Sequence, residues 1–242
     1  MYLSIVIPAF QESKKIARDI EAASEFLAAN DFIGEIIVVD DGSTDATAET
    51  AQNAGQNLPP TISLQVISLG EHRGKGCAVR TGILKSSGKY VMFADSGGCV
   101  PYGNALLGLE MLTAGNCHIA HGSRRLIESD IQRDQPWHRR VCAKFFKWIM
   151  NTILTIPRGL SDTQCGFKLY DGEVARKLYS QAVCDGFMFD VEIILLAVKH
   201  HLRIEEFAIE WICDLDSRLS ITRTPWPVLA ELWRIKRRHA KE

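Results

Sequence analysis

The stretch EIIVVDDGSTD, residues 35–45, joins a run of apolar, mostly β-branched side chains to two aspartates, a glycine and hydroxyl-bearing residues. A short apolar run that stops at acidic residues and glycine is typical of a buried strand that ends in a loop. Similar runs, rich in valine and isoleucine, recur along the first half of the chain. The predicted strands cover residues 3–8, 35–41, 63–68, 90–95 and 118–123.

The segments between these strands have the length and pattern of helices, over residues 13–29, 44–55, 75–87 and 102–115. Ser43 or Thr44 is the expected N-cap of the second helix. Strands that alternate with helices indicate βαβ units, in which the strands run parallel. The sequence therefore predicts an α/β fold with a mostly parallel, twisted sheet flanked by helices, and ligand groups at the carboxyl ends of the strands.

The composition is that of an ordinary globular protein: 242 residues, 46% hydrophobic and 24% charged, with a net charge of −1. Such a charge gives no general attraction to nucleic acid. The seven cysteines are odd in number and lack CxxC spacing, which favours neither a zinc cluster nor a disulfide framework. No uncharged apolar run reaches the ~18 residues of a membrane span, and the N-terminus has no basic leader. We expect a cytoplasmic protein, peripheral on the cytoplasmic membrane face.

The ends of the predicted strands carry an unusual number of polar residues. The first strand ends in PAFQE (8–12), the second in DDGSTD (40–45), the fourth in DSGG (95–98) and the fifth in GSRR (122–125). The third is followed by GEHRGKGCAVRTG (70–82), in which glycines surround basic residues. Any one of these could be only a polar loop, but all of them at one edge of a sheet indicate a site for a charged, polyhydroxylated ligand.

The segment WHRRVCAKFFKWIMNTILTIP, residues 137–157, predicts an amphipathic helix. Arg140, Lys144 and Lys147 fall on one face, and aromatic and aliphatic residues cover most of the rest. Such a helix suits the surface of an anionic membrane, or it packs on the sheet with its basic stripe in water. A second basic cluster, at 234–241, follows two tryptophans and favours membrane contact.

A nucleoside diphosphate sugar needs acceptors for its base and ribose, cations for its diphosphate and donors for its sugar hydroxyls. Asp40 and Asp41, where the second strand ends, can accept from base N–H and ribose O–H groups, and so can Glu12. Lys75 stands between two glycines, a pattern similar to a phosphate loop but without Walker spacing. The predicted edge of the sheet therefore offers the groups that such a donor needs.

The chain carries, in this order, IVIPAFQE, IIVVDDGSTD, HRGKGCAVRTG, VMFADSGG and DTQCGFKLY. Together these segments resemble the family 2 glycosyltransferases of the GT-A fold, in the branch of dolichyl-phosphate glucosyltransferases and dolichol-phosphate mannose synthases. The resemblance covers roughly residues 3–220. It implies transfer of a hexose, with inversion at the anomeric carbon, from a UDP- or GDP-sugar to a polyprenyl or dolichyl phosphate at the membrane. It also makes residues 137–157 an interfacial helix that holds the lipid acceptor.

The resemblance assigns roles by position. Asp95 would lie near the ribose and a metal, Arg124 would bind the acceptor phosphate, and Arg218 would reach the donor diphosphate; these three are expected to act in catalysis. Lys75 would lie near the base. The other expected substrate-binding residues are Pro8, Ala9, Glu12, Asp40, Asp41, Arg139, Arg140, Asp162, Gln164 and Lys168. Asp162 could instead orient a loop. Because a phosphate acceptor is already an anion, positioning and charge stabilisation would drive the transfer without a strong base.

One position departs from the family pattern. Relatives carry Asp-x-Asp where the fourth strand ends, and here the sequence is Asp95, Ser96, Gly97. Two carboxylates hold Mg²⁺ or Mn²⁺ better than one carboxylate and water, so we expect a metal that is weakly held or dispensable, with basic residues such as Arg218 neutralising the diphosphate. The same departure leaves open a rival function, that of a sugar-nucleotide-binding protein that has lost turnover.

The alternation of strands and helices breaks down after residue 124. We expect one GT-A catalytic domain over residues 1–220, with a nucleotide-binding half over 1–123 and an acceptor half over 124–220. Residues 221–242 would form a basic C-terminal helix or tail.

Overall fold

The computed structural model of the chain describes residues 1–131, 159–212 and 225–239, together with their side chains except those of 225–230 and 239. The predicted interfacial helix at 137–157 lies outside the described residues, as do the candidate residues Arg139, Arg140 and Arg218.

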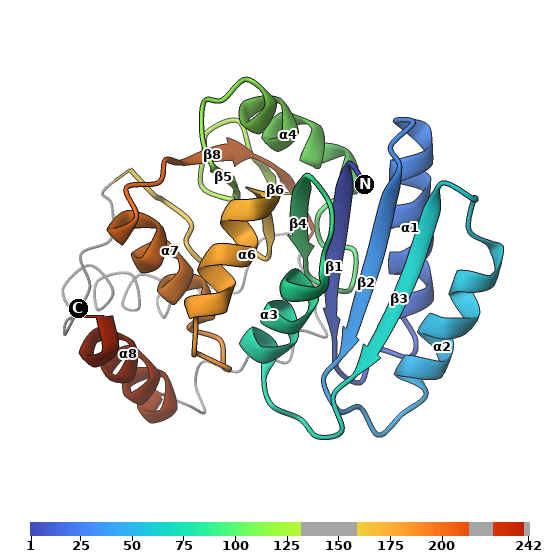
Figure 1. Ribbon diagram of the computed structural model, residues 1–242, viewed down its shortest axis with the longest axis horizontal. Coiled ribbons are helices and arrows are strands. Elements are labelled where there is room, and N and C mark those ends of the chain that lie inside the picture. The colour runs from blue at the N-terminus through green and yellow to red at the C-terminus, as the bar shows by residue number, and fades with distance from the viewer. Residues whose placement is uncertain (132–158, 213–224, 240–242) are drawn as a thin grey trace.

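Seven strands form the central sheet, in the order β3-β2-β1-β4-β7-β5-β8 (Figure 1). Neighbouring strands are parallel except at β7, which runs antiparallel to both β4 and β5. The predicted mostly parallel sheet is therefore confirmed, although the sequence did not predict β7. The strands are β1 (Leu3–Ala9), β2 (Gly34–Asp40), β3 (Ile62–Ser68), β4 (Tyr90–Ala94), β5 (Ile119–Ser123), β7 (Phe167–Asp171) and β8 (Ile204–Ala208).

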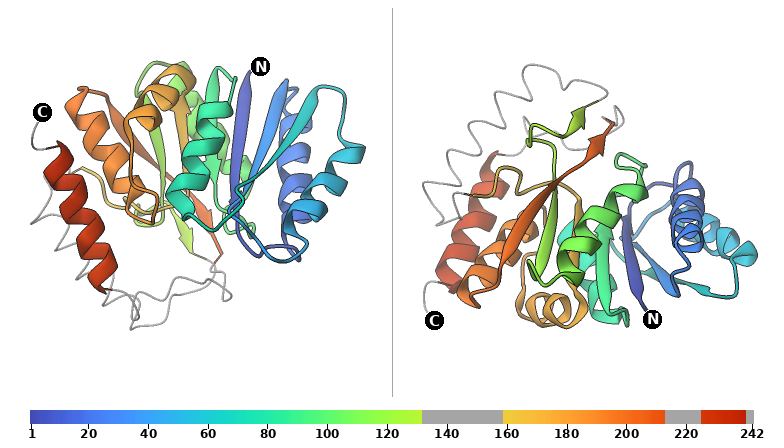
Figure 2. Two further views of the ribbon diagram at one scale, coloured as in Figure 1. Left: turned by 60° about the horizontal axis from the view of Figure 1, so that its bottom comes forward. Right: turned by 90° about the horizontal axis from the view of Figure 1, so that it is seen from above.

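Helices cover both faces of this sheet (Figures 1 and 2). One face packs against α1 (Ile16–Ala29), α2 (Thr47–Ala54) and α4 (Ala105–Thr113). The other face packs against α3 (Lys75–Lys85), α6 (Gly172–Gln181), α7 (Phe189–Lys199) and α8 (Pro225–His239). Short elements complete the described chain: β6 (Asp130–Ile131) pairs with β9 (Glu210–Trp211), and η1 (Gly55–Asn57) and η2 (Tyr102–Asn104) are single 3-10 turns.

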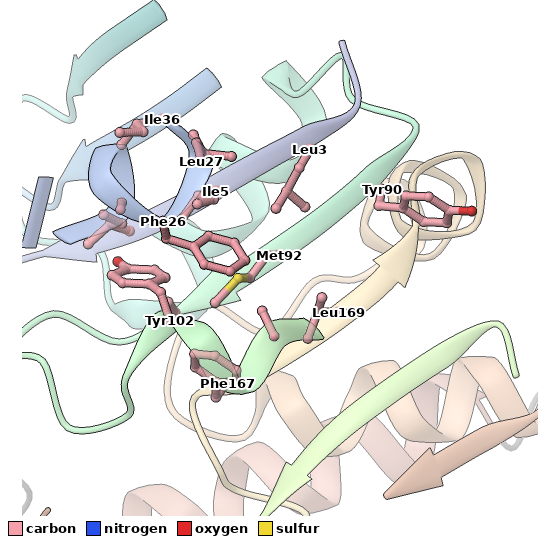
Figure 3. Close-up of a cluster of buried hydrophobic side chains, with 14 of the residues drawn as sticks. Leu3, Ile5, Phe26, Leu27, Ile36, Tyr90, Met92, Tyr102, Phe167 and Leu169 are labelled. Atoms are coloured by element: carbon pink, nitrogen blue, oxygen red, sulfur yellow. The ribbon is translucent and has the colours of Figure 1, made fainter. Parts of the chain in front are cut away.

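The strands at the centre of the sheet are buried along their whole length, as expected where helices cover both faces. Successive residues of β1 point to opposite faces, so that Ile5 belongs to the core under α1 and Val6 to the core under α3. Figure 3 shows the first of these cores, where Phe26 and Leu27 of α1 face Ile5 and Met92. Each such side chain contributes roughly 1.5–3 kcal/mol through removal from water.

The expected N-cap of α2 at Ser43 or Thr44 is wrong, because α2 begins at Thr47 and neither hydroxyl caps it. Ser43 Oγ instead accepts from the backbone N–H of Gln11 at 2.8 Å, and Thr44 Oγ1 accepts from Gln11 Nε2 at 2.7 Å. Gln11 has a φ of 55°, in the left-handed region that non-glycine residues rarely adopt. The two hydroxyls therefore hold the loop after β1 in an unusual conformation beside the loop after β2.

Helix α8 lies along α7 at the far end of the sheet from α2 (Figures 1 and 2). Leu232 and Ile235 are buried in the core under α7, whereas Trp233 is 62% exposed. None of the helices in the described ranges is long and apolar enough to cross a membrane.

Candidate active site

The parallel strands end at one edge of the twisted sheet, toward which β1, β2 and β3 run downward in Figure 1. Because β7 runs in the opposite direction, the residues just before it lie at the same edge. The backbone N–H of Asp95, which follows β4, donates to the carbonyl of Gly166, which precedes β7, at 2.8 Å. A Cβ atom at Gly166 would overlap the carboxylate of Asp95, so any other residue here would force a shift. The segments VMFADSGG and DTQCGFKLY, far apart in sequence, thus meet at Asp95.

Lys75 and Asp95 form an ion pair at the centre of this edge. Lys75 Nζ lies 2.6 Å from Asp95 Oδ1 and 5.2 Å from the centroid of the Phe93 ring. The side chains of Lys75 and Asp95 are 20% and 36% exposed, so both remain accessible to a ligand. Burial opposes the charge on Lys75, but the carboxylates of Asp95 and Asp190 outweigh it and raise the pKa of the lysine. Lys75, in the first turn of α3, therefore stays positively charged close to the end of β4.

A second ion pair joins Arg124, after β5, to Asp162. Arg124 Nε and a terminal nitrogen donate to the two carboxylate oxygens at 2.6 and 2.9 Å, a bidentate arrangement, and its guanidinium lies 5.4 Å from the Trp211 ring centroid. Burial alone would raise the pKa of Asp162, but the hydrogen bonds and charge of Arg124 lower it to about 2. Asp162 therefore holds the guanidinium of Arg124 in one orientation.

Asp40 and Asp41, where β2 ends, use their carboxylates to shape loops. Asp41 is 2% exposed and accepts from the backbone N–H groups of Arg73 and Gly74, each at 2.8 Å, while His72 Nδ1 lies 2.8 Å from the same carboxylate. Asp40 is also buried and accepts from the N–H of Ser43 at 3.2 Å. Asp41 thus sets the path of the backbone that leads into Lys75.

The remaining sequence-predicted residues lie at different depths. Pro8 and Ala9 are buried at the end of β1, and Glu12 is half-buried in the loop that follows. Gln164 is half-buried and donates to the carbonyl of Phe187 at 3.4 Å. Lys168 is 1% exposed inside β7, where its ammonium lies 2.7 Å from Asp190 Oδ1 and also donates to the carbonyl of Cys165. The structure therefore places Lys168 behind the edge that holds Lys75 and Asp95.

The described residues do not fit a tightly held divalent metal. Among them there is no group of three or more histidine, cysteine, aspartate or glutamate residues that could bind one. One oxygen of Asp95 already contacts Lys75, and Gly97 has no side chain to supply a second carboxylate. A divalent ion at Asp95 would either share the carboxylate with the lysine ammonium or displace it, and it would take most of its ligands from water or substrate.

Sequence reasoning missed three acidic residues that support the edge. Asp185 pairs with Arg80 and, at 3.8 Å, with Arg73, and its carbonyl accepts from the N–H of Cys77 at 3.1 Å. Glu206 of β8 accepts from the N–H of Asp162 at 2.7 Å. Asp19 of α1 accepts from the N–H of Gly97 at 2.7 Å. Of these three, only Asp19 could have been noticed in the sequence. It is an acidic residue at a position of α1 where the helical spacing of apolar residues predicts burial.

Comparison with known proteins identifies the family of this chain. The sequence profile of Glycosyl transferase family 2 matches residues 4–179, which include every described candidate residue. The chain belongs to glycosyl transferase family 2. It is therefore a glycosyltransferase, and the family predicted from the sequence is confirmed.

This family 2 chain is similar to dolichyl-phosphate β-glucosyltransferases. It is 31% identical to the one from Dictyostelium discoideum over 98% of this chain and 77% of the relative. It is 31% identical to the one from Homo sapiens over 86% and 67%, and 33% identical to the one from Saccharomyces cerevisiae over 87% and 67%. The branch that the sequence motifs predicted is confirmed by these matches.

Solved structures confirm the GT-A fold. Glucosyl-3-phosphoglycerate synthase from Mycobacterium tuberculosis, in complex with Mn²⁺, UDP and phosphoglyceric acid, has a TM-score of 0.72 at 19% identity, covering 97% of this chain and 78% of that one. Mannosyl-3-phosphoglycerate synthase from Rubrobacter xylanophilus has a TM-score of 0.69 at 19% identity, covering 100% and 76%. Because both structures are only 19% identical to this chain, the similarity shows a shared fold.

Proposed function

We propose that this protein transfers glucose from a nucleoside diphosphate sugar to a polyprenyl phosphate of the dolichyl type, with inversion at the anomeric carbon. The observation that carries the proposal is the similarity to dolichyl-phosphate β-glucosyltransferases over 86–98% of the chain. The arrangement of Lys75, Asp95 and Arg124 supports it, because two cations on one edge suit a reaction between two phosphate-bearing substrates. Transfer of labelled glucose to polyprenyl phosphate tests it.

In the proposed reaction an oxygen of the acceptor phosphate attacks the anomeric carbon of glucose. The bond from that carbon to the nucleoside diphosphate breaks, and the electron pair leaves with the diphosphate. The attacking phosphate is already an anion, so no residue has to remove a proton from it. The protein would act by holding the two substrates in line and by stabilising the negative charge of the leaving diphosphate.

The donor would bind along the ends of β1, β2 and β4. We assign Pro8, Ala9, Glu12 and Asp40 to the base and ribose, with Asp41 holding the loop beside them. Lys75 would turn from Asp95 toward the diphosphate, because a doubly charged diphosphate attracts the ammonium more strongly than one carboxylate does. Asp95, released from the lysine, would accept from a ribose hydroxyl.

The acceptor would bind on the side of β5 and β7. Arg124 is held by Asp162 with its planar guanidinium fixed, which suits the recognition of a phosphate. We assign the acceptor phosphate to Arg124, with Arg139 or Arg140, and a contact with the donor diphosphate to Arg218. Gln164 would line the acceptor half. Lys168 would support this half from behind through its pairing with Asp190.

We propose that Mg²⁺ or Mn²⁺ is weakly held or dispensable in this site. The Lys75–Asp95 pair supports this proposal, since the ammonium takes a carboxylate oxygen that a metal would need. A bound ion, where present, would add positive charge beside the diphosphate. Lys75 and Arg218 would supply that charge in its absence.

We also propose that the protein binds peripherally to the cytoplasmic membrane face, where a lipid acceptor would be found. Helix α8 supports the proposal, because its exposed side carries Trp233 and four cations and its opposite side is buried. Arg237 lies 5.2 Å from the ring centroid of Trp233. An exposed tryptophan among cations suits an anionic headgroup layer. The cations are Arg234, Lys236, Arg237 and Arg238.

We propose that residues 1–220 act as one catalytic domain, since strands from both halves share one sheet. A second candidate function is the binding of a sugar nucleotide without turnover. Gly97 favours this function, because the family pattern has an aspartate at this position and glycine has no carboxylate. Tight binding of a UDP- or GDP-sugar, with no transfer to polyprenyl phosphate, would favour this second function over the first.

A further inference from the structure

A buried carboxylate from α1 reaches the loop that follows Asp95. Asp19 is 3% exposed, and its Oδ2 accepts a hydrogen bond of 2.7 Å from the backbone N–H of Gly97. In the helix it lies beside Ile16, Ile20 and Ala23, on the face that packs against the sheet. A charged group at such a position costs free energy unless it makes a compensating contact. The compensating contact here is with the loop of the candidate site.

Among the described residues, few contacts other than this hydrogen bond hold the middle of the loop. Gly97 and Gly98 have φ values of 98° and 64°, and two adjacent glycines are the most flexible pair a chain can have. Before them, Asp95 N–H donates to the carbonyl of Gly166 at 2.8 Å. After them, the carbonyl of Cys99 accepts from the N–H of Ile212 at 2.9 Å. Asp19 supplies the fixed point between these two anchors.

Gly97 is also the position at which the family pattern has its second aspartate. In this chain that position has no side chain, and a carboxylate reaches its backbone from a different element instead. We infer that Asp19 is a positioning residue of the donor site: it holds the Gly97–Gly98 turn, and with it Asp95 and Lys75, in the arrangement that receives the nucleoside diphosphate. The inference rests on the function proposed above, since it concerns the same donor.

The groups that face Asp19 come from several elements. Arg18 and Lys15 lie near it on and before α1, Glu12 in the loop after β1, and Tyr102 in η2. Burial raises the pKa of Asp19 to about 6, although the hydrogen bond from Gly97 and the charge of Arg18 oppose this rise. The carboxylate is therefore charged at pH 7.5 and becomes neutral below about pH 6. The charge-assisted hydrogen bond to Gly97 weakens over the same range.

Two variants at Asp19 and one matched control test the inference. Asp19→Ala removes the acceptor, and Asp19→Asn keeps an acceptor of the same shape without the charge. Glu25→Gln removes an exposed carboxylate from the same helix and serves as the control. Binding of UDP and of GDP is measured by calorimetry between pH 5 and 8, and amide hydrogen exchange is followed in the peptide that contains Gly97.

We expect Asp19→Ala to weaken nucleotide binding about tenfold or more at pH 7.5 and to speed exchange at Gly97, with Glu25→Gln like the wild type. In Asp19→Asn, affinity should be reduced at pH 7.5, and the difference from the wild type should disappear below about pH 6, where the wild-type carboxylate is neutral as well. Unchanged affinity and exchange in folded Asp19→Ala would overturn the inference alone. If Asp19→Ala does not fold, a wild-type pH profile in Asp19→Asn would overturn it. Wild-type protein that binds neither nucleotide would overturn the inference together with the proposed function.

Discussion

The ammonium of Lys75, in the first turn of α3, lies 2.6 Å from Oδ1 of Asp95, at the end of β4. This contact joins the glycine-rich segment after β3 to the segment in which family members carry Asp-x-Asp. It places a protein cation beside the carboxylate that the sequence resemblance assigns to a metal.

Replacement of Lys75 should weaken donor binding. Lys75→Met removes the cation that we assign to the diphosphate, and a hydrogen bond to a charged group contributes about 1.5–3 kcal/mol. We expect the Kd of UDP or GDP to rise roughly tenfold to a hundredfold, with partial recovery in Lys75→Arg. Calorimetry measures this directly. Lys85→Met, an exposed lysine at the end of the same helix, is the control, and an equal effect there would rule out a specific role for Lys75.

Removal of divalent metal should leave a substantial part of the activity. With one carboxylate at the end of β4, and that carboxylate paired with Lys75, any ion would be held mainly by substrate and water under our proposal. We expect turnover to persist in EDTA and to change only at high micromolar or millimolar Mg²⁺ or Mn²⁺. Turnover that is absent in EDTA and saturates at low micromolar metal would contradict this expectation.

Replacement of Asp162 should destabilise the fold and impair the acceptor side. Asp162→Asn leaves the guanidinium of Arg124 without its carboxylate partner, which we expect to cost roughly 2–3 kcal/mol, less than for a fully buried pair because Arg124 is 25% exposed. The pKa of Asp162 is about 2, below its ordinary value, so the pair stabilises the fold above about pH 4 and this contribution is lost as the pH falls toward 2. Urea unfolding at several pH values measures the loss of stability in the variant and the dependence of that loss on pH. A wild type and variant of equal stability at pH 7 would show that the pair has no net effect.

A side chain at Gly166 should displace Asp95. The Cβ of alanine would overlap the carboxylate of Asp95, so either the carboxylate or the backbone of the following strand must shift. We expect Gly166→Ala to lower kcat/KM for the donor at least tenfold, with a smaller effect on the acceptor. Gly103→Ala, at a glycine whose Cβ would contact no atom within 4 Å, is the control. Normal donor kinetics in Gly166→Ala would mean that Asp95 does not act in the position described.

Reversal of charge on α8 should release the protein from anionic vesicles. Arg234→Glu combined with Arg238→Glu changes the exposed side without touching the buried Leu232 and Ile235. Each basic residue near an anionic surface contributes about 1 kcal/mol, so we expect flotation with phosphatidylglycerol vesicles to fall severalfold or more. Lys85→Glu, on another helix, should float like the wild type. Undiminished flotation of the double variant would exclude α8 as a membrane contact.

Much of the fold could be predicted because local sequence and global structure agree. The strands that end in DDGSTD and DSGG are short, apolar and β-branched or aromatic, and they form as predicted to within one or two residues. β7 was missed because FKLYD alternates too briefly to indicate a strand by itself, and its direction depends on neighbours far away in sequence. That direction is what brings Gly166 to Asp95.

The sequence predicted which residues belong to the candidate site, but it did not predict which of them contact one another. Sequence order brings Lys75 and Asp95 to the same edge, yet nothing in their spacing indicates a contact of 2.6 Å. The burial of Lys168 against Asp190 could not be predicted either, because lysines are rarely buried and the partner lies 22 positions later in the sequence. Asp19 stands at the helical spacing of buried positions, but its partner could not be predicted, because that partner is a backbone N–H group of a distant loop.

The most direct test of the account is the transfer of radiolabelled glucose from UDP-glucose, and in parallel from GDP-glucose, to dolichyl or another polyprenyl phosphate in detergent. We expect label to move into the organic phase as a β-linked glucosyl phospholipid with one of the two donors, and Lys75→Met to reduce this transfer at least tenfold. Wild-type protein that binds a donor tightly but gives no labelled lipid with either nucleotide, with or without Mg²⁺ or Mn²⁺, would contradict it.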